Sequence, residues 1–475
     1  MRRIRTGILI QAAGVAVALS CPGALGAATV LVDDDGDSVA LDGLVTLREA
    51  LISLNAGQDL HDDVTGNRSG AAYSTDDRIE FAIGSGSVTI TLATPLPPLR
   101  RAIRIDGTSQ PGFVSTPLIV IDGGAAGAAV AGLVIGDGAA GALDALEIRS
   151  FTGHGVLVGS LLFADGFEVG GITAWNGGGL PAADVELDHL VVGANGGDGI
   201  RIDALGSVVL RNFDIHDNAG TGLLVLQAAG DPGLAVEGPS SLVADNGGDG
   251  VAFGNAETQS GPIAARLYLT EIRGNEIGLR IEQRGGAATT TTEIVGAIVH
   301  DNRDSGVRLA SSYQAQVYPY TPFRNNKVFH NAIGEGCLSE QTAPQIAVVG
   351  PVVARAETTA ACTGAAQEAC EEAPSTTGEP CYWTGSTCIV VWNLGGAFDC
   401  NSIYAEPNQI HSYNTSDADE LSVGLYASAG ALVHANSNSW RTGEYSQNVD
   451  QCCFSFVVLD TYCGGSVLTC VSPAP

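Results

Sequence analysis

Lysine and aromatic residues are scarce in this chain of 475 residues. Lysine occurs once, at Lys327, and aromatic residues make up only 6% of the sequence. Apolar residues nevertheless reach 45% and charged residues stay at 16%, a balance that excludes an intrinsically disordered chain. Together with 63 glycines, this composition favours one long repetitive body with small residues at its corners over several compact domains.

Positive charge is also scarce, because 22 lysines and arginines face 52 acidic residues, which gives a formal net charge of −30. Such an excess of negative charge repels phosphate backbones, so we expect no nucleic-acid partner. Beyond the first residues, no apolar run is long enough to cross a bilayer. We therefore expect no transmembrane segment in the mature chain.

The first 27 residues have the pattern of a secretory signal peptide. Three arginines in residues 1–5 precede an apolar stretch at residues 8–19 that is too short to span a bilayer. Small residues at 26–28 predict cleavage near residue 27, whereas Leu19-Ser20-Cys21 leaves lipid anchoring at Cys21 as the alternative. We therefore expect a secreted, extracellular or cell-surface protein.

Cysteine is absent between residues 22 and 336, although the chain has 11 cysteines. In an exported chain, such a local set predicts disulfides, with zinc as the alternative, and the spacing leaves the connectivity open. The disulfide candidates are Cys337, Cys362, Cys370, Cys381, Cys388, Cys400, Cys452, Cys453, Cys463 and Cys470.

A repeat of 23 to 29 residues runs through the middle of the chain, and each unit carries an asparagine followed three or four residues later by a glycine. Apolar residues alternate on both sides of this pair, which indicates short strands and excludes stacked helices. We expect the asparagine amides to hydrogen-bond from coil to coil and the glycine to supply the backbone freedom of the corner. The repeated residues are Asn195 with Gly199, Asn218 with Gly222, Asn246 with Gly250, Asn275 with Gly278, and Asn302 with Gly306.

These patterns predict an all-β fold, a right-handed parallel β-helix, or solenoid, with a short N-terminal helical cap and a Cys-rich C-terminal region. Earlier strands are visible at residues 87–92, 102–107, 118–123 and 146–148, so we expect the β-helix to begin near residue 80. The expected units are a signal peptide at 1–27, a strand and cap at 28–79, the β-helix at 80–352, a disulfide-held insertion at 353–390, further coils at 391–445 and a Cys-rich patch at 446–475.

The segment Leu47-Arg48-Glu49-Ala50 and residues 55–57, 77–81 and 105–113 resemble the CSLREA family of exported bacterial proteins. The resemblance covers roughly residues 28–345 and implies a short helix followed by a right-handed parallel β-helix, without fixing an activity. Val45 stands where the family has its cysteine, so a disulfide tether of the cap is not implied here. The spacing of Leu47, Leu51 and Leu54 independently predicts an apolar helix face that covers the open end of the first coil.

Arg280 and Arg308 are candidates for substrate binding, because each follows its repeat glycine by two residues and both should share one outward face. Lyases of acidic polysaccharides on this fold use an arginine beside a calcium site. The alternative is a pair of solvated strand residues in ion pairs, Arg280 with Glu282 and Arg201 with Asp203.

Two tryptophans and one acidic turn are further candidates. Trp383 and Trp440 could stack on sugar rings, although packing at an irregular end is the alternative. Asp33, Asp35 and Asp37 cluster enough carboxylate to attract Ca²⁺, and a solvated acidic turn is the alternative. We expect no other cofactor.

Gly153-His154-Gly155 resembles the polygalacturonase signature, but the acidic pair and the lysine that accompany it there are missing, so an ordinary glycine turn is favoured. The sequence also has no phosphate-binding loop, nucleophile elbow or zinc-protease helix. We therefore predict a non-enzymatic protein whose rigid face binds polysaccharide, a cell-surface glycan or another surface. The alternative is an extracellular polysaccharide lyase or glycoside hydrolase that acts on acidic polysaccharide.

Overall fold

The computed structural model describes residues 27–70, 72–136, 139–159, 184–203, 207–227, 234–237, 241–255, 264–283, 290–311, 319–320, 323–324, 326–329 and 331, and beyond these only the backbones of strands up to residue 469. The predicted signal peptide and Cys21 lie outside the described residues. No helix in the described part of the chain is both long and apolar enough to cross a membrane.

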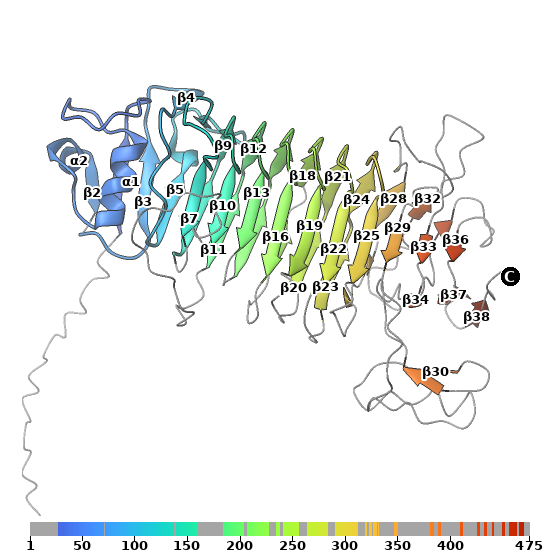
Figure 1. The fold of residues 1–475 in the computed structure, drawn as a ribbon. Helices are drawn as coiled ribbons and strands as arrows, with labels where there is room; N and C mark the ends of the chain where they lie inside the picture. Colours follow the sequence, from blue (N-terminus) through green and yellow to red (C-terminus); the bar gives the residue numbers. More distant parts are fainter. Residues whose placement is uncertain are drawn as a thin grey trace, which may run out of the picture.

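Most strands belong to three long sheets, here named A, B and C, which run side by side along the molecule (Figure 1). Sheet A contains β1 (Ala28–Val32), β2 (Arg68–Gly70), β3 (Asp77–Phe81), β5 (Ile103–Asp106), β8 (Gly141–Asp144), β11 (Val185–Asp188), β14 (Val208–Arg211), β17 (Leu234–Glu237), β20 (Ala264–Tyr268), β23 (Thr290–Val295), β26 (Pro319–Tyr320) and β27 (Phe323–Arg324). Sheet B contains β4 (Val88–Thr91), β6 (Ile119–Asp122), β9 (Leu146–Arg149), β12 (Val191–Gly193), β15 (Asp214–His216), β18 (Ser241–Ala244), β21 (Thr270–Arg273), β24 (Ile298–His300), β28 (Lys327–Phe329), β32 (Gln409–His411) and β35 (Ser439–Trp440). Sheet C contains β7 (Leu133–Gly136), β10 (Val156–Gly159), β13 (Ile200–Asp203), β16 (Leu223–Gln227), β19 (Val251–Asn255), β22 (Leu279–Gln283), β25 (Val307–Ser311), β29 (Ile346–Val349), β33 (Leu425–Ala427) and β36 (Val449–Gln451).

The chain visits sheets A, B and C in turn and then returns to sheet A one rung further along. β11 is followed by β12 in sheet B and β13 in sheet C, and β14 then pairs with β11 in parallel, with Val185 opposite Val208. In Figure 1 the strands of sheet C run downward on the near face while the stack advances to the right, so the winding is right-handed. The parallel β-helix that the repeat predicts is therefore confirmed, with rungs about 4.8 Å apart.

The interior is one apolar column, because every second residue of each strand points inward. In β13 the side chains of Ile200 and Ile202 are buried while Arg201 and Asp203 are only partly buried, and β14 repeats this alternation. The same buried cluster extends from Val30 in the first strand to Val328 in β28. Alternation with a period of two in the sequence thus produces one narrow core rather than several.

Two of the three corners in a typical coil are turned by a single residue with positive φ. One residue with positive φ turns the chain from sheet A to sheet B, and another turns it from sheet B to sheet C. The first group is Ala145, His189, Asn212, Leu269 and Gly296, and the second is Ser150, Ala194, Asp217, Asp245, Gly274 and Asp301. The connections from sheet C back to sheet A vary in length and lie mostly outside the described residues.

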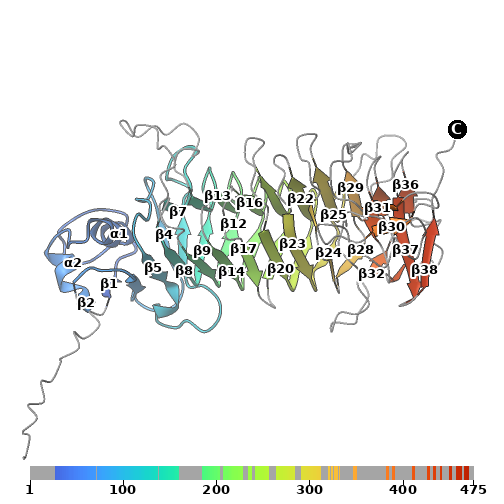
Figure 2. The same ribbon diagram turned by 90° about the horizontal axis from the view of Figure 1, so that it is seen from below.

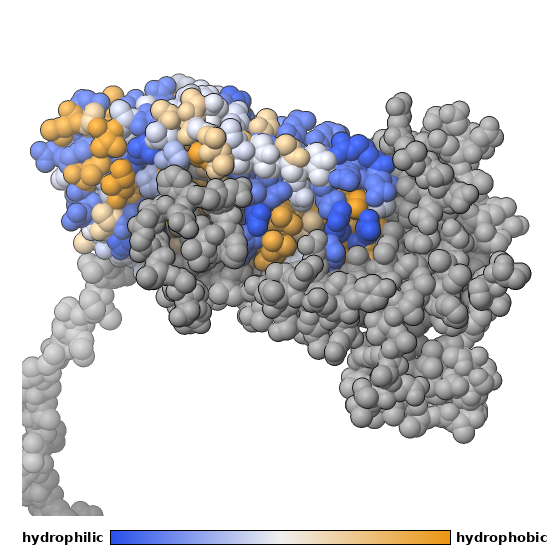
Figure 3. Space-filling view, in the orientation of Figure 1, coloured by the Kyte–Doolittle hydropathy of each residue, from blue (hydrophilic) through white to orange (hydrophobic). Residues whose placement is uncertain are grey.

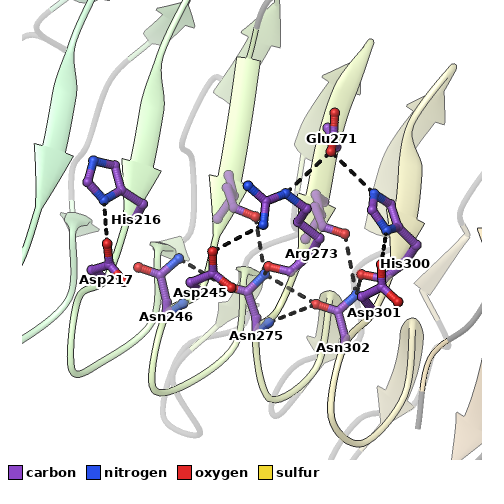
Figure 4. A network of polar contacts seen from close by, with 12 residues as sticks. His216, Asp217, Asp245, Asn246, Glu271, Arg273, Asn275, His300, Asp301 and Asn302 are labelled. Atoms are coloured by element: carbon purple, nitrogen blue, oxygen red, sulfur yellow. Dashed lines mark hydrogen bonds and ion pairs between the residues drawn. The ribbon is translucent and has the colours of Figure 1, made fainter. Parts of the chain in front are cut away.

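The predicted asparagine ladder lies at the corner between sheets B and C (Figure 4). Asn275 accepts hydrogen bonds through Oδ1 from the backbone N–H and the Nδ2 of Asn246, at 3.0 and 2.9 Å. The same pair of bonds links Asn195 to Asn218, Asn218 to Asn246, Asn275 to Asn302, and Asn302 to Asn331. All six asparagines are buried, so the ladder satisfies polar groups that would otherwise destabilise the fold.

The role predicted for the repeat glycines is wrong. Gly199, Gly250 and Gly278 do not have positive φ, because the residue before each asparagine makes the turn instead. A Cβ atom at Gly250 would lie 2.7 Å from Nδ2 of Asn275 and 2.7 Å from the carbonyl oxygen of Gly278. Glycine is required here for the close approach of the next coil.

Two short helices lie at the N-terminal end of the stack, as Figures 1 and 2 show. α1 (Leu47–Ala56) begins with a capping box between Thr46 and Glu49 and ends at Gly57, which has a left-handed conformation. Its predicted apolar face is buried, with Leu47, Leu51 and Leu54 in the core cluster. α2 (Asp62–Gly66) follows, and a 3₁₀ turn, η1 (Gly107–Ser109), comes after β5.

The sequence predicted that the β-helix begins near residue 80, but the structure shows that it begins earlier. β1 pairs in parallel with β3, with Val30 opposite Ile79, so the strand at residues 28–32 is already part of sheet A. α1 is inserted between these two paired strands along the chain. The sequence did not reveal this pairing because 44 residues separate the end of β1 from the start of β3.

Strand pairing also continues beyond residue 352. β32 pairs in parallel with β28 and β33 with β29, which extends sheets B and C, and β35 and β36 follow. Two small sheets complete the described strands: β30 (Cys381–Trp383) with β31 (Cys388–Val390), and β34 (Leu432–His434) with β37 (Phe456–Tyr462) and β38 (Gly465–Thr469).

Candidate functional site

The candidate site is the outward face of sheet C, where the sequence placed Arg280 and Arg308. β22 and β25 pair with these two arginines directly opposite each other, so the prediction that they share one face is confirmed. Arg201 stands in the same row, three rungs before Arg280. From β13 to β25 this row reads Arg201, Leu224, Ala252, Arg280 and Arg308.

Asp249 holds the guanidinium of Arg280. Oδ2 of Asp249 lies 2.7 Å from Nε of Arg280, and Oδ1 accepts a hydrogen bond from Nη2 at 3.1 Å. The predicted partner Glu282 is further away, at 3.9 Å. Only 9% of the Asp249 side chain is exposed, and this burial raises the pKa of its carboxyl group, although the positive charge of Arg280 opposes the rise. Arg280 is therefore a positioned cation rather than a mobile one.

Arg308 differs from Arg280 in its surroundings. Among the residues that the structure describes, Arg308 makes no hydrogen bond and no ion pair, although its charge also acts on Asp249. Like charges directly opposite each other on neighbouring strands destabilise a sheet. Asp249 and Glu282 offset the two positive charges, so the distinctive feature of this part of the face is the guanidinium of Arg308, which has no ion-pair partner among the described residues.

A second polar cluster lies three rungs earlier on the same face. Arg201 donates from Nε to Oδ2 of Asp203 at 2.8 Å, which is the ion pair predicted as the alternative to binding. Burial raises the pKa of Asp203, while the charges of Arg201 and His154 act in the opposite direction. Oδ1 of Asp203 is buried without a hydrogen-bond partner among the described residues.

His154 belongs to this second cluster rather than to an ordinary glycine turn alone. The backbone N–H of Asp198 donates to Nδ1 of His154 at 3.0 Å. Nδ1 also lies 3.3 Å from Oδ2 of Asp198, so the backbone and the side chain of Asp198 both position the ring. Sequence analysis missed Asp198 and Asp249 because each directly precedes a repeat glycine and looks like a turn residue.

The outward face of sheet B is also polar, but carboxylates outnumber the one arginine of its network (Figure 4). Arg273 contacts Asp245 at 3.1 Å and Glu271 at 3.4 Å, and Glu271 lies 3.3 Å from Nε2 of His300. His300 also contacts Asp301 through Nδ1 at 2.6 Å. This network holds the corner, and its excess of carboxylates makes it less suited to an acidic ligand than the arginine pair of sheet C.

The acidic turn predicted to bind calcium contributes contacts within the protein. Asp37 forms a two-point ion pair with Arg48, with contacts of 2.8 and 2.9 Å. Asp33 accepts a hydrogen bond from the backbone N–H of Val45 at 2.7 Å, whereas Asp35 is exposed. Within the described residues, no three acidic, histidine or cysteine side chains come close enough to hold a metal ion.

The remaining predicted residues lie where the structure gives no side chains. Trp383 is in β30 and Trp440 is in β35, but only their backbones are described. Cys381 and Cys388 are in the paired strands β30 and β31. The other disulfide candidates, Cys337, Cys362, Cys370, Cys400, Cys452, Cys453, Cys463 and Cys470, lie outside the described residues.

Comparison with known proteins gives only distant likenesses. No family model matches the sequence, and no curated protein matches it either. Among solved structures, the A-module of the Azotobacter vinelandii mannuronan C-5 epimerase AlgE4 is 11% identical, with a TM-score of 0.42 over 90% of this chain and 97% of that chain. The AlgE6 A-module from the same organism is 12% identical, with a TM-score of 0.37 over 80% of this chain and 91% of that chain. Tailspike protein 2 of the Escherichia coli O157:H7 bacteriophage CAB120 is 14% identical, with a TM-score of 0.34 over 60% of this chain and 38% of that chain. Likenesses this distant carry no conclusion about activity.

Proposed function

We propose that this chain is an exported β-helix protein of the CSLREA type, secreted or held at the cell surface, and that sheet C binds an acidic polysaccharide. The observation that carries the proposal is the pair Arg280 and Arg308, directly opposite each other on neighbouring strands. Asp249 orients the first guanidinium, and the second has no acidic partner among the described residues. A planar guanidinium suits the carboxylate of a uronic acid or a sulfate ester.

The spacing of the rungs supports a polymeric ligand. Outward side chains repeat about every 4.8 Å along the axis, which is close to the length of one sugar unit in an extended polysaccharide. Leu224 and Ala252 lie in the same row between Arg201 and Arg280, so apolar and charged positions follow one another along the face. Ala252 is buried, with an exposed fraction of 6%, so Leu224 is the apolar residue of this row that would contact a sugar ring while the arginines contact its acidic substituent.

The net negative charge of the protein opposes the long-range attraction of an acidic polysaccharide. With a formal net charge of −30, the protein repels an acidic polymer at long range. Affinity must therefore come from local contacts at the arginine pair, and removal of either arginine should have a large effect.

We propose in addition that α1 is the cap of the β-helix. Leu47 and Leu54 are buried in the core cluster at the N-terminal end, beside the first paired strands. Uncovered strand edges promote aggregation, so a helix at this end has a clear physical role. The Cys-rich C-terminal region with disulfides, and calcium at Asp33, Asp35 and Asp37, stand as further proposals. The ion pair between Asp37 and Arg48 weakens the calcium proposal.

Binding to immobilised polygalacturonate and alginate tests the main proposal, with neutral dextran as the reference polymer. Arg308→Ala and Arg280→Ala should each weaken binding to the acidic polymers about tenfold or more, because each removes a hydrogen bond to a charged group. Arg273→Ala on sheet B is the matched control and should bind like the wild type. Equal retention of all four proteins would contradict the proposal.

A catalytic role is the second candidate, and His154 with Asp203 favours it. Asp198 positions the histidine ring, and burial raises the pKa of the Asp203 carboxyl group, as general acids and bases often require. Incubation with pectin and alginate, with and without calcium, should be followed for new reducing ends and unsaturated uronates. Product formation that disappears in His154→Ala would establish a lyase or hydrolase; absence of product with intact binding would support a binding protein.

A further inference from the structure

Exposed apolar side chains gather at the N-terminal end of the molecule. Among the described residues, Val39, Leu41, Leu44 and Leu60 have exposed fractions of 49%, 69%, 43% and 37%, and we call these four residues the cap patch. Only Val114 and Leu269 are large, apolar and exposed elsewhere in the described chain. Figure 3 shows apolar surface gathered at this end, over the region of α1 and α2.

Shared carboxylates hold the two segments of the cap patch together. Oε1 of Glu49 accepts a hydrogen bond from the backbone N–H of Ala40 at 2.7 Å and also lies 2.9 Å from Nε2 of His61. Oδ2 of Asp63 accepts hydrogen bonds from the backbone N–H groups of Asp42 and Gly43, at 2.7 and 2.8 Å. The loop at residues 39–44 and the segment at residues 60–63 are therefore joined at two points.

These hydrogen bonds fix the loop with its apolar side chains outward. Glu49 is buried, and its second oxygen accepts from the backbone N–H of Thr46, so this carboxylate is held by α1 itself. A loop that served only to connect β1 with α1 would gain stability by exposing polar residues instead. Contiguous apolar surface that a rigid framework keeps in water is typical of a docking site.

The rim of the cap patch is acidic. Asp42 lies within the loop, Asp62 follows Leu60 by two residues, and both are exposed. The two arginines nearest in the sequence are already in ion pairs, Arg48 with Asp37 and Arg68 with Asp59. A second copy of this chain would bring a like-charged rim to the interface, whereas a basic partner would complement it.

We propose that the cap patch docks an apolar segment of another protein that is flanked by lysine or arginine. The leucines and valine would be covered by the apolar residues of that segment, and Asp42 and Asp62 would face its positive charges. The proposal does not depend on polysaccharide binding, because the cap patch and the arginine pair are at different places along the β-helix.

Fluorescence anisotropy with three labelled model peptides tests the proposal on the full mature chain. The probes are an amphipathic leucine–lysine peptide, its leucine–glutamate counterpart and a serine–lysine peptide without apolar residues. The leucine–lysine peptide should bind saturably and more weakly at high salt, and the other two should not bind. Equal binding of the leucine–glutamate or serine–lysine peptide would overturn the proposal.

The variant Leu41→Ser with Leu44→Ser should weaken binding of the leucine–lysine peptide about tenfold or more, because both contacts are apolar. Val114→Ser, which removes a side chain that is 88% exposed elsewhere, is the matched control and should bind like the wild type. Both variants change exposed residues, and circular dichroism verifies that they fold. Unchanged binding by the double variant, or self-association of the wild type that the double variant abolishes, would overturn the proposal.

Discussion

At the scale of single residues, sheet A carries an unusual row of like charges. Glu80, Asp106, Asp144 and Asp188 stand opposite one another on the neighbouring strands β3, β5, β8 and β11. Burial raises the pKa of Asp144, and the negative charges of Asp188 and Asp106 raise it further. Nδ1 of His189 lies 3.0 Å from Oδ1 of Asp188 and 3.7 Å from Oδ1 of Asp144, and the interaction with His189 opposes part of the rise in the pKa of Asp144.

This row predicts that Asp144→Asn stabilises the protein at neutral pH. Because the pKa of Asp144 is higher in the folded than in the unfolded state, its favourable contribution is complete at low pH and is lost as pH rises through the folded pKa. The variant should therefore show a higher urea midpoint than the wild type at pH 7, and the difference should shrink toward pH 3. Asp184→Asn, at an exposed position, is the control. A lower midpoint for Asp144→Asn at pH 7 would refute the argument.

Asp59 is a second carboxylate whose pKa depends on contacts within the fold. Burial alone would raise the pKa of Asp59, but hydrogen bonds from Arg68 and Tyr73 and the charge of Arg68 together lower it. Arg68 also lies over the ring of Tyr73, 5.3 Å from its centroid. These contacts tie the segment after α1 to β2, and no spacing in the sequence indicates them.

At the scale of elements, the four residues of the Leu-Arg-Glu-Ala segment serve three different roles. Leu47 and Ala50 are buried, and Glu49 completes the capping box of α1. Arg48 binds Asp37 and also donates to the backbone carbonyl oxygens of Pro95 and Thr94, at 2.7 and 2.8 Å. The helix is thus attached to the acidic turn and to the loop after β4 by polar contacts, in addition to the packing of its apolar face.

The corner between sheets B and C predicts a large effect for Gly250→Ala. The added Cβ would meet Nδ2 of Asn275 and the backbone of the next coil, so the ladder or the strand must move. We expect a loss of about 1–3 kcal/mol in the free energy of unfolding, as for other overpacked positions. Gly66→Ala, where nothing lies within 4 Å of the added Cβ, should be tolerated. Equal urea midpoints for the two variants would contradict this role of the repeat glycine.

At the scale of the whole molecule, each coil contacts mainly the coils before and after it. The strands of sheet C, for example, pair only with their immediate neighbours from β7 to β36. Stability in such a stack is close to a sum of local terms, so a defect need not spread through the entire protein.

This arrangement predicts a local response to Ile272→Ala in β21. Ile272 is fully buried, so the cavity should reduce stability by about 2–5 kcal/mol. Hydrogen exchange should become faster in β18, β21 and β24, which pair directly, and stay unchanged in β1 and β3. Ile272→Val is the control and should cost only about 0.5–1.5 kcal/mol. Faster exchange throughout the described strands would show that the stack opens as one unit.

The sequence by itself determined the fold to a large extent. The fold follows from local patterns that recur in each repeat. These patterns are the alternation of apolar residues and the asparagine that is followed by a glycine. The ladder could be predicted because its hydrogen bonds join equivalent positions of successive repeats. The shared face of Arg280 and Arg308 followed from the same equivalence.

Only the tertiary structure decided which charged side chains of different coils contact each other. Asp249 and Arg280 are 31 residues apart and come from different coils, as do His154 and Asp198, at 44 residues. Such contacts depend on how neighbouring coils are aligned across connections of varying length between sheets C and A. A local pattern determines whether a side chain points inward or outward. Which residue it contacts on the next coil depends on the length of each repeat, and this length varies along the sequence.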